Sequence, residues 1–320
     1  MPKPRLAIAF SGGRSSAVMT RLCLDRSSET YEIVVTFANT GCEHPATLDF
    51  VRDCDAHWGF NTVWLEAIID PLDGGGVSHK IVSYATASRK GEPFEAAIAK
   101  YGIPNPTNPW CTSRLKQDVQ EHYLKSIGWK RGKQLGHKTA IGIRADVIDR
   151  MSQHAEMNGI IYPLVEAGVT KSKVNAIMAQ QPWDLNIAND AFGNCVWCWK
   201  KADRKLFTLA KLAPEVFDFP ERMEQAHGHV KTGENYKATG PDGRRHFFRG
   251  HRDVADIKQE AQDKLKKGLV LYTDQVQTSI FDELLDLGGG CSDSCEAYTE
   301  DTDGPLIAAA PRLLRAVTPA

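Results

Sequence analysis

The chain has 320 residues, with 39 basic and 40 acidic side chains and a formal net charge of −1. A hydrophobic content of 42% and a charged content of 25% are ordinary for a globular enzyme and exclude a disordered chain. The charge balance excludes a globally basic nucleic-acid-binding protein, although it allows a local basic face. No apolar run approaches the roughly 20 residues of a membrane helix. Leu6–Phe10 is too short for a signal-peptide core, so we expect a cytoplasmic protein with no membrane partner.

Eight cysteines are the feature of the composition that most needs an explanation. Because no secretion signal is recognised, metal or redox chemistry is expected rather than disulfides. Cys195 and Cys198 form a Cys-x-x-Cys pattern, which can place two thiolates on one metal or form a redox dithiol. Cys23 and Cys54 lie in helical patterns and Cys42 in a loop, and these three are expected to be packing residues.

Strand and helix patterns alternate through the first half of the chain. Short apolar or β-branched runs predict strands at Arg5–Phe10, Tyr31–Phe37, Asn61–Ala67 and Lys138–Ile143. Helical patterns predict helices at Ser15–Leu24, Pro45–Trp58, Gly91–Tyr101 and Ser113–Ile127. This alternation is typical of βαβ units and predicts an α/β fold, with an open, mostly parallel sheet and helices on both faces.

The second part of the chain has a different character. From about residue 193, short helical patterns such as Arg204–Leu212 and Val254–Lys267 are separated by polar loops, which predicts a smaller, mainly helical region. Within it, Asn235–Arg252 is rich in glycine, arginine and histidine and is expected to be a mobile surface loop. The Ala/Pro-rich end of the chain, Leu306–Ala320, is expected to fray.

A glycine-rich turn follows the first predicted strand and opens the first predicted helix. Its residues are Ser11, Gly12, Gly13, Arg14, Ser15 and Ser16. Glycines let backbone N–H groups approach an anion, and a helix N-terminus adds positive potential. The alternative is a tight strand-to-helix turn with a serine cap. The turn lacks the Gly-Lys-Ser/Thr ending of a Walker P-loop.

This turn resembles the PP-loop of the adenine nucleotide alpha hydrolase-like superfamily, whose pyrophosphatase form has an aspartate where this chain has Ser15. Four further segments are similar, in order, to elements of the phosphoadenosine phosphosulfate (PAPS) reductase branch. They are Thr36–Glu43, Trp110–Lys116, Gly142–Arg150 and Ile161–Leu164. The resemblance covers roughly residues 5–200.

The resemblance implies a Rossmann-like fold and a division of the chain into three parts. A PP-loop nucleotide-binding domain would span residues 1–192. A cysteine-containing, mainly helical region would span residues 193–305, and a flexible tail residues 306–320.

Arg144 and Arg150 follow the last predicted strand, at the edge where open α/β sheets bind ligands. A guanidinium group presents a planar fork that matches phosphate or sulfate. Lys116 could add a third positive charge. The alternative role for such arginines is a surface ion pair, for instance with Asp146 or Asp149.

The resemblance also implies which residues bind and transform the ligand. That ligand would be an adenine nucleotide, PAPS or ATP, with Mg²⁺ as an optional companion. The implied binding residues are Ser11, Gly12, Gly13, Arg14, Ser15, Ser16, Asn39, Thr40, Gly41, Glu43 and Arg150. The implied catalytic residues are Cys111, Lys116 and Arg144, whose two cations would neutralise the anion.

Cys111, Cys195 and Cys198 are the candidate metal ligands. Three thiolates would leave one iron of a 4Fe–4S cluster open, as in related tRNA thiolation enzymes, and zinc is the alternative metal. Cys291 or Cys295 could supply a fourth ligand, or could deliver a thiol to the site as the C-terminal cysteine of a PAPS reductase does.

The leading interpretation is a PAPS reductase-family enzyme that binds an adenine nucleotide or phosphosulfate and reduces or transfers sulfur. A cysteine thiolate would attack the sulfuryl sulfur, and a thiol or electron donor such as thioredoxin would complete the reduction. One alternative is an ATP-dependent sulfurtransferase that modifies tRNA or DNA, which the basic stretches Lys200–Lys205 and Arg244–Arg252 favour only weakly. Another is a non-catalytic nucleotide-binding module with a structural zinc.

Overall fold

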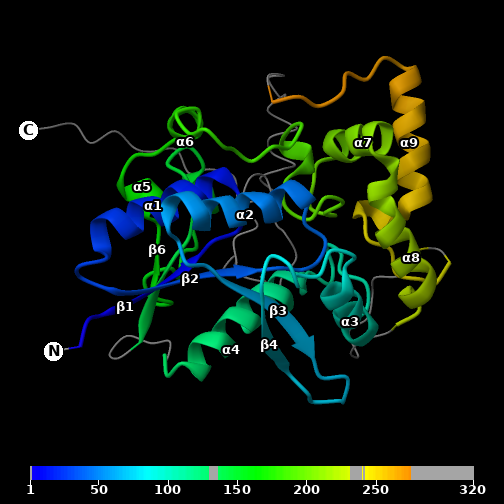
Figure 1. Ribbon diagram of the computed structural model, residues 1–320. Coiled ribbons are helices and arrows are strands. Elements are labelled where there is room, and N and C mark those ends of the chain that lie inside the picture. The colour runs from blue at the N-terminus through cyan, green and yellow to red at the C-terminus, as the bar shows by residue number, and fades with distance from the viewer. Residues whose placement is uncertain (1, 130–135, 231–239, 241, 275–320) are drawn as a thin grey trace, which may run out of the picture.

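The computed structural model describes residues 2–129, 136–230, 240 and 242–274 (Figure 1). Their strands form one six-stranded sheet in the order β4-β3-β2-β1-β5-β6. The strands are β1 (Arg5–Ala9), β2 (Glu32–Ala38), β3 (Val63–Ile69), β4 (Val77–Val82), β5 (His137–Ala140) and β6 (Ile160–Ile161). Every neighbouring pair is parallel except β3 and β4, so the predicted α/β fold with a mostly parallel sheet is confirmed.

Helices connect the strands and make up most of the second half of the described chain. The α-helices are α1 (Arg14–Ser27), α2 (Pro45–Trp58), α3 (Glu92–Tyr101), α4 (Asp118–Ser126), α5 (Pro163–Glu166), α6 (Lys171–Met178), α7 (Asp203–Leu212), α8 (Asp218–His227) and α9 (Val254–Lys266). The shorter segments are the π-helical η1 (Ser113–Gln117) and the 3-10 helices η2 (Ile148–Arg150), η3 (Asp190–Phe192), η4 (Pro214–Phe217) and η5 (Arg249–His251).

Both faces of the sheet are covered, as the continuous apolar pattern of β1 predicts. Ile8 of β1 belongs to a cluster that includes Val18 of α1 and Leu48 of α2. The neighbouring Ala7 packs with Leu124 of α4 on the opposite face. Figure 1 shows α1 and α2 on one side of the sheet and α4 on the other. Successive residues of a strand point to opposite faces, so a strand buried on both sides must be apolar throughout.

The strand order determines where a ligand can bind. β1 lies between β2 and β5, because the chain moves outward through β2 and β3 and then returns to the other side of β1. Ligands of open α/β sheets bind at such a reversal, beyond the carboxyl ends of the strands. The turn after β1 and the loop after β5 therefore meet at the expected binding edge.

The C-terminal helices share a hydrophobic cluster with the sheet and do not pack separately from it. That cluster joins Leu65 of β3 and Phe94 of α3 to Trp197 and Phe247. The Trp197 ring lies 5.2 Å from the Phe94 ring and 4.9 Å from the Phe247 ring, measured between centroids. The segment around Trp197 is thereby held against the sheet domain.

The expectation of a mobile surface loop at Asn235–Arg252 is wrong for residues 242–252, which the structure describes. Phe247 and Phe248 are 0% and 1% exposed and belong to the core. The prediction relied on the polar composition of this stretch and did not take its two adjacent aromatic residues into account. Burial of their rings offsets the entropy lost when the polar residues around them become ordered. The predicted tail at 306–320 lies outside the described residues.

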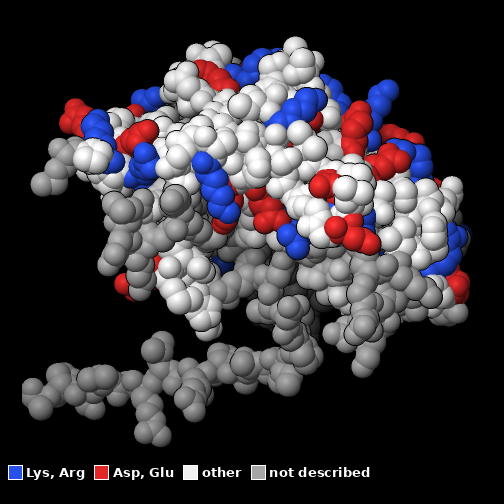
Figure 2. Space-filling view, turned by 90° about the horizontal axis from the view of Figure 1, so that it is seen from below, with Lys and Arg blue, Asp and Glu red and all other residues white. Residues whose placement is uncertain are grey.

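The basic side chains of this stretch are used within the chain. Arg249 donates to the carbonyl oxygen of Lys200 at 2.9 Å, and Arg252 pairs with Asp203 at 2.7 Å. In the described part of the face seen in Figure 2, Lys and Arg alternate with Asp and Glu, so neither sign dominates there. Among residues 2–129, 136–230, 240 and 242–274, no helix combines the length and apolar character needed to cross a bilayer.

A buried carboxyl group ties α8 to the segments that follow it. Glu224 accepts hydrogen bonds from the backbone N–H groups of Phe247 at 2.9 Å and Val254 at 3.0 Å. Burial raises the pKa of Glu224 to about 8, although both hydrogen bonds act to lower it.

Glu224 should make the folded protein less stable as pH rises. The unfolded chain releases this proton near pH 4.5, whereas the folded chain keeps it until about pH 8. The free energy of unfolding should therefore fall between these values, by at most about 1.4 kcal/mol per pH unit. In Glu224→Gln this contribution to the slope disappears, whereas the exposed control Glu215→Gln keeps it. Denaturant unfolding across this pH range measures the slopes, and equal slopes for Glu224→Gln and wild type would contradict the assignment.

Candidate functional site

The turn after β1 is held in a single shape by its own serines. Ser16 Oγ accepts from the Ser11 backbone N–H at 3.2 Å and donates to the Gly13 carbonyl at 2.9 Å. Gly12 has φ of +78°, and a Cβ there would lie 2.7 Å from Cγ2 of Thr47. Glycine adopts this conformation without strain. Because it has no side chain, the turn can also pack closely against α2. The hydroxyl group of Ser16 thus stabilises the conformation of the turn through hydrogen bonds to its backbone.

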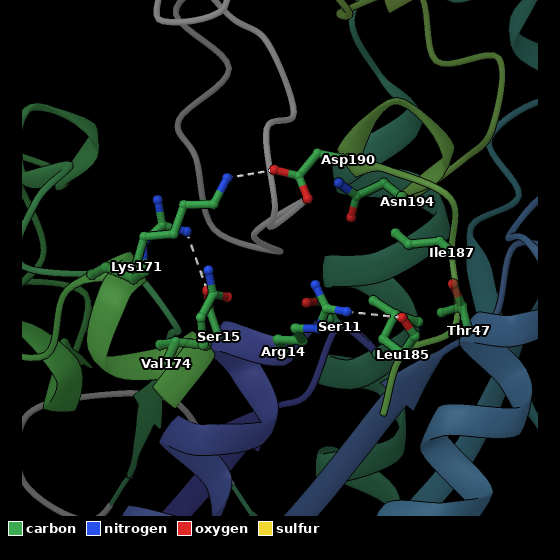
Figure 3. A pocket seen from close by; sticks show the side chains of 15 residues that line it. Ser11, Arg14, Ser15, Thr47, Lys171, Val174, Leu185, Ile187, Asp190 and Asn194 are labelled. Carbon is green, nitrogen blue, oxygen red and sulfur yellow. Dashed lines mark hydrogen bonds and ion pairs between the residues drawn. The ribbon is translucent and has the colours of Figure 1, made fainter. Parts of the chain in front are cut away.

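A pocket of about 520 Å³, open to solvent, lies against this turn and the start of α1. Its lining includes the turn residues Ser11, Gly12, Gly13, Arg14 and Ser15. Gly13 caps α1 without a side-chain hydrogen bond, and the first turn of α1 has no acidic residue. The backbone N–H groups there are the natural ligands of an anion. We call this cavity the anion pocket, and Figure 3 shows its lining.

Arg144 lies at the predicted binding edge and also forms the predicted ion pair with Asp146. It comes from the loop after β5, is 7% exposed and lines the anion pocket. Its guanidinium donates to Ser15 Oγ at 3.2 Å and pairs with Asp146 at 3.1 Å. Arg150 lies in η2 and is not among the residues that line the anion pocket.

The other cations of the anion pocket also have carboxylate partners. Arg14 forms a two-pronged pair with Asp184, at 2.7 and 2.8 Å. Lys171, from the first turn of α6, lies 2.5 Å from Asp190 of η3. An anion entering the pocket must therefore compete with these aspartates. Sequence reasoning missed Lys171, which begins α6 but follows no recognised motif.

A second pocket, of about 360 Å³, brings the three candidate cysteines together. Cys111, Cys195 and Cys198 all line it, with Lys116 and Thr40. We call it the cysteine pocket. Lys116 thus lies beside the cysteines and not in the anion pocket. Lys116 belongs to η1, a π-helical turn, which is a distortion that often occurs at functional sites.

Aromatic side chains and a hydroxyl surround these sulfurs. Phe94, Trp197 and Trp199 line the cysteine pocket and limit the access of water. Thr40 Oγ1 lies 3.5 Å from Cys195 Sγ and donates to the Glu43 carboxylate at 2.8 Å. The second-strand element therefore contacts the cysteine pocket and not the anion pocket.

The remaining residues of this element shape its loop. Asn39 donates to Glu66 at 2.8 Å and accepts from the Gly41 N–H at 3.2 Å. Cys42 is buried, accepts a backbone hydrogen bond from Val196 at 3.1 Å and is in the same cluster as Cys195. Burial, and then the nearby Cys195, raise the pKa of the Cys42 thiol.

A buried lysine, which the sequence interpretation did not single out, organises the cysteine segment. Lys201 is 1% exposed. Its Nζ, with three N–H donors, lies within hydrogen-bond distance of four backbone carbonyl oxygens, those of Ala191 at 2.6 Å, Gly193 at 3.0 Å, Cys195 at 3.1 Å and Val196 at 2.6 Å. The available signal was a pair of lysines, Lys200 and Lys201, directly after the apolar run that contains the Cys-x-x-Cys pattern.

The two pockets meet within a single stretch of backbone. Gly193 and Asn194 line the anion pocket, and the next residue, Cys195, lines the cysteine pocket. Asn194 has φ of +57°, a conformation that asparagine tolerates better than most residues. The linings of the two pockets are therefore contiguous along the chain at Asn194 and Cys195.

The donor chemistry suits an iron–sulfur cluster, but the described residues do not converge as ligands of a single ion must. No group of three His, Cys, Asp or Glu side chains in the described part of the chain could hold one metal ion. A cluster distributes its thiolates over several irons, so its ligands need not meet at one point. No disulfide joins two of the six described cysteines. Cys291 and Cys295 lie outside the described residues.

Comparison with known proteins agrees with this geometry. The family model of the phosphoadenosine phosphosulfate reductase domain matches residues 5–107, and this match confirms the resemblance to the PAPS reductase family, within the PP-loop superfamily. The matched segment holds the turn after β1, the second-strand element and α3. Residues 5–107 are thus similar to the PAPS reductase domain, in agreement with the α/β fold that the structure shows.

Individual relatives extend the similarity along the chain. The uncharacterized nin region protein ORF290 of Escherichia phage lambda is 29% identical over 304 residues, which cover 92% of this chain and 96% of that protein. The uncharacterized protein MJ0066 of Methanocaldococcus jannaschii is 28% identical over 130 residues, 39% of this chain and 22% of that protein. A phosphate complex of the PAPS reductase of Candida auris shares 18% identity over 55% of this chain and 72% of that chain, with a TM-score of 0.32, too low to support a conclusion.

Replacing Lys201 should be among the most damaging single changes in this region. Lys201→Met leaves four buried carbonyl groups without their donor, and each such loss costs about 1–3 kcal/mol before relaxation. We expect a loss of at least about 3 kcal/mol in the free energy of unfolding. Denaturant titration measures it. The matched control is Lys266→Met, on a lysine whose side chain is 76% exposed, which should change stability by less than about 0.5 kcal/mol. Equal stability of the two variants would refute this role of Lys201.

Proposed function

We propose that this protein is a PAPS reductase-family enzyme that binds an adenine nucleotide or phosphosulfate in the anion pocket and reduces or transfers sulfur at the cysteine pocket. The observation that supports the proposal best is that consecutive residues, Asn194 and Cys195, line the two pockets. An anion held at the turn after β1 would thus present its reactive end to thiols. The thiols that this chemistry needs stay reduced in the cytoplasm, where we expect the protein to act.

The anion pocket provides the groups that such a ligand requires. Backbone N–H groups of the first turn of α1, and the Ser11 and Ser15 hydroxyls, would donate to phosphate or sulfate oxygens. Arg144 would add two parallel N–H donors, and its contact with Ser15 already aims it at the turn. Because Ser15 stands where a carboxylate occurs in pyrophosphatase PP-loops, no negative charge at that position repels the anion.

The cysteine pocket would carry out the sulfur step. In the reductase version, a thiolate attacks the sulfuryl sulfur, forming an S–S bond as the sulfur–oxygen bond breaks and the nucleotide leaves with the electron pair. A second thiolate then attacks the cysteine sulfur, which gives a disulfide and releases sulfite. Cys111 is the least buried of the three pocket cysteines and is the thiol that we assign to the attack. Lys116 would stabilise the charge in the buried pocket.

In the cluster version, Cys111, Cys195 and Cys198 would instead hold a 4Fe–4S cluster. The cluster would supply an open iron at which sulfur can be held. The aromatic residues of the cysteine pocket would exclude water, and Lys201 would keep the two ligands of the Cys-x-x-Cys loop in position. Cys111 cannot act as nucleophile and ligand at once, so metal content distinguishes the two versions.

Sulfite release tests the reductase activity directly. Purified protein incubated with PAPS, thioredoxin and a thioredoxin-reducing system should release sulfite, and Cys111→Ser should abolish the release. Cys54→Ala, which removes a helical cysteine outside both pockets, is the control and should retain it. If a protein that binds PAPS yields no sulfite, the reductase version fails.

Metal content tests the cluster. Anaerobically purified protein should be brown and contain iron and acid-labile sulfide, and Cys195→Ser and Cys198→Ser should lose both, unlike Cys54→Ala. A colourless, zinc-loaded protein would favour the structural zinc module instead. Release of pyrophosphate from ATP only when RNA or DNA is present would favour the nucleic-acid sulfurtransferase.

Arg144 should make a large contribution to ligand affinity. Arg144→Lys keeps the charge and loses the planar fork, so we expect PAPS to bind about tenfold more weakly, and about a hundredfold more weakly in Arg144→Met. Calorimetry measures both constants. The control Arg21→Met removes an exposed arginine of α1 that is paired with Asp25 and should leave affinity unchanged. Wild-type affinity in Arg144→Met would exclude Arg144 from the ligand site.

A further inference from the structure

The ion pair between Lys171 and Asp190 joins two walls of the anion pocket. Both residues line that pocket, and the ammonium and carboxylate are 2.5 Å apart. Lys171 belongs to α6, whereas Asp190 begins η3, directly before the cysteine segment. Figure 3 shows the two side chains reaching toward each other across the cavity, with Asn194 beside Asp190.

The Lys171 side of this pair is fixed to the anion-binding residues. The backbone N–H of Lys171 donates to Asp146 Oδ1 at 3.1 Å, and Asp146 in turn pairs with Arg144. Lys171 therefore stays at the pocket whether or not its ammonium contacts Asp190.

The Asp190 side is connected to the sulfurs. Asp190 is followed within η3 by Ala191, whose carbonyl accepts from Lys201. The same ammonium holds the Cys195 carbonyl, so η3 and the cysteine segment share one anchor. A change at Asp190 can thus alter the backbone position of Cys195, because only a few covalent and hydrogen bonds separate the two residues.

The ion pair is suited to exchange. The Lys171 side chain is 40% exposed and that of Asp190 is 12% exposed, so water reaches the pair from the lysine side. Partly exposed ion pairs contribute little net stability. A phosphate group has more charge than a carboxylate and competes well for an ammonium group within reach.

We propose that Lys171 is a ligand-binding residue that exchanges Asp190 for an anionic group of the bound nucleotide, and that this exchange loosens the cysteine segment and exposes the Cys195 thiol. The inference rests on the proposed function, because it requires a ligand in the anion pocket. It also defines the ligand class, a nucleotide with two anionic groups, one at the turn after β1 and one at Lys171. Coupling of this kind is reciprocal, so modification of Cys195 should also change ligand affinity.

Inorganic pyrophosphate is the probe, because it carries two anionic groups and is too small to shield the cysteines. Iodoacetamide labelling of Cys195, followed by peptide mass spectrometry, should be roughly fivefold faster with pyrophosphate than without it. Asp190→Asn should label at the fast rate without pyrophosphate and show no further increase. Lys258→Met, which removes an ion pair with Glu221 in which neither residue lines a pocket, should behave as wild type.

Binding measurements separate this exchange from a general loosening of the structure. By calorimetry, Lys171→Met should bind pyrophosphate about tenfold more weakly, whereas Asp190→Asn should bind it more tightly because the competing carboxylate is gone. Weaker binding in Asp190→Asn would overturn the exchange. Unchanged Cys195 labelling in wild type with bound pyrophosphate would overturn the coupling and leave the proposed function intact. No binding of pyrophosphate or PAPS to wild type would overturn both.

Discussion

One buried ammonium group determines the shape of the segment on which both pockets depend. The carbonyl oxygens of Ala191, Gly193, Cys195 and Val196 all point to Lys201 Nζ. A compact ammonium with rotatable donors suits such a convergence better than a planar guanidinium. These carbonyls could not face one another in an apolar interior without the ammonium, because each would be buried without a donor. The backbone that carries Cys195 is therefore held by a residue that lines neither pocket.

The second constraint is that the cations of the anion pocket are paired with carboxylates of the same chain. Each of its three cations is paired with an aspartate: Arg14 with Asp184, Arg144 with Asp146 and Lys171 with Asp190. These pairs bring the charge of the pocket close to neutral. A ligand must then offer more negative charge than a carboxylate does, which favours phosphate and sulfate groups over simple acids. In this way pairing contributes to selectivity as well as to stability.

Local patterns predicted the sheet and the turn after β1 because both depend on residues close together in the chain. β4 was missed because it is an edge strand with one buried residue, Val82, and has no apolar run to reveal it. Tertiary contacts decided the rest. Only the fold could bring Cys111 beside Cys195, or place Lys116 in the cysteine pocket and not in the anion pocket. Lys171 and Lys201 were missed for the same reason, since their partners lie 5–19 residues away, in the short helix η3 and in the segment that follows it.

The central claim is that the two pockets form one reaction site, so that sulfur of a ligand in the anion pocket reaches a cysteine. The most direct test is to incubate the protein with PAPS without any reductant and to map sulfonated cysteines by mass spectrometry of unreduced peptides. The account predicts a sulfonate on Cys111 or on another cysteine of the cysteine pocket in the wild type, and its loss in Arg144→Met. Bound PAPS with every pocket cysteine unmodified would contradict a shared reaction site.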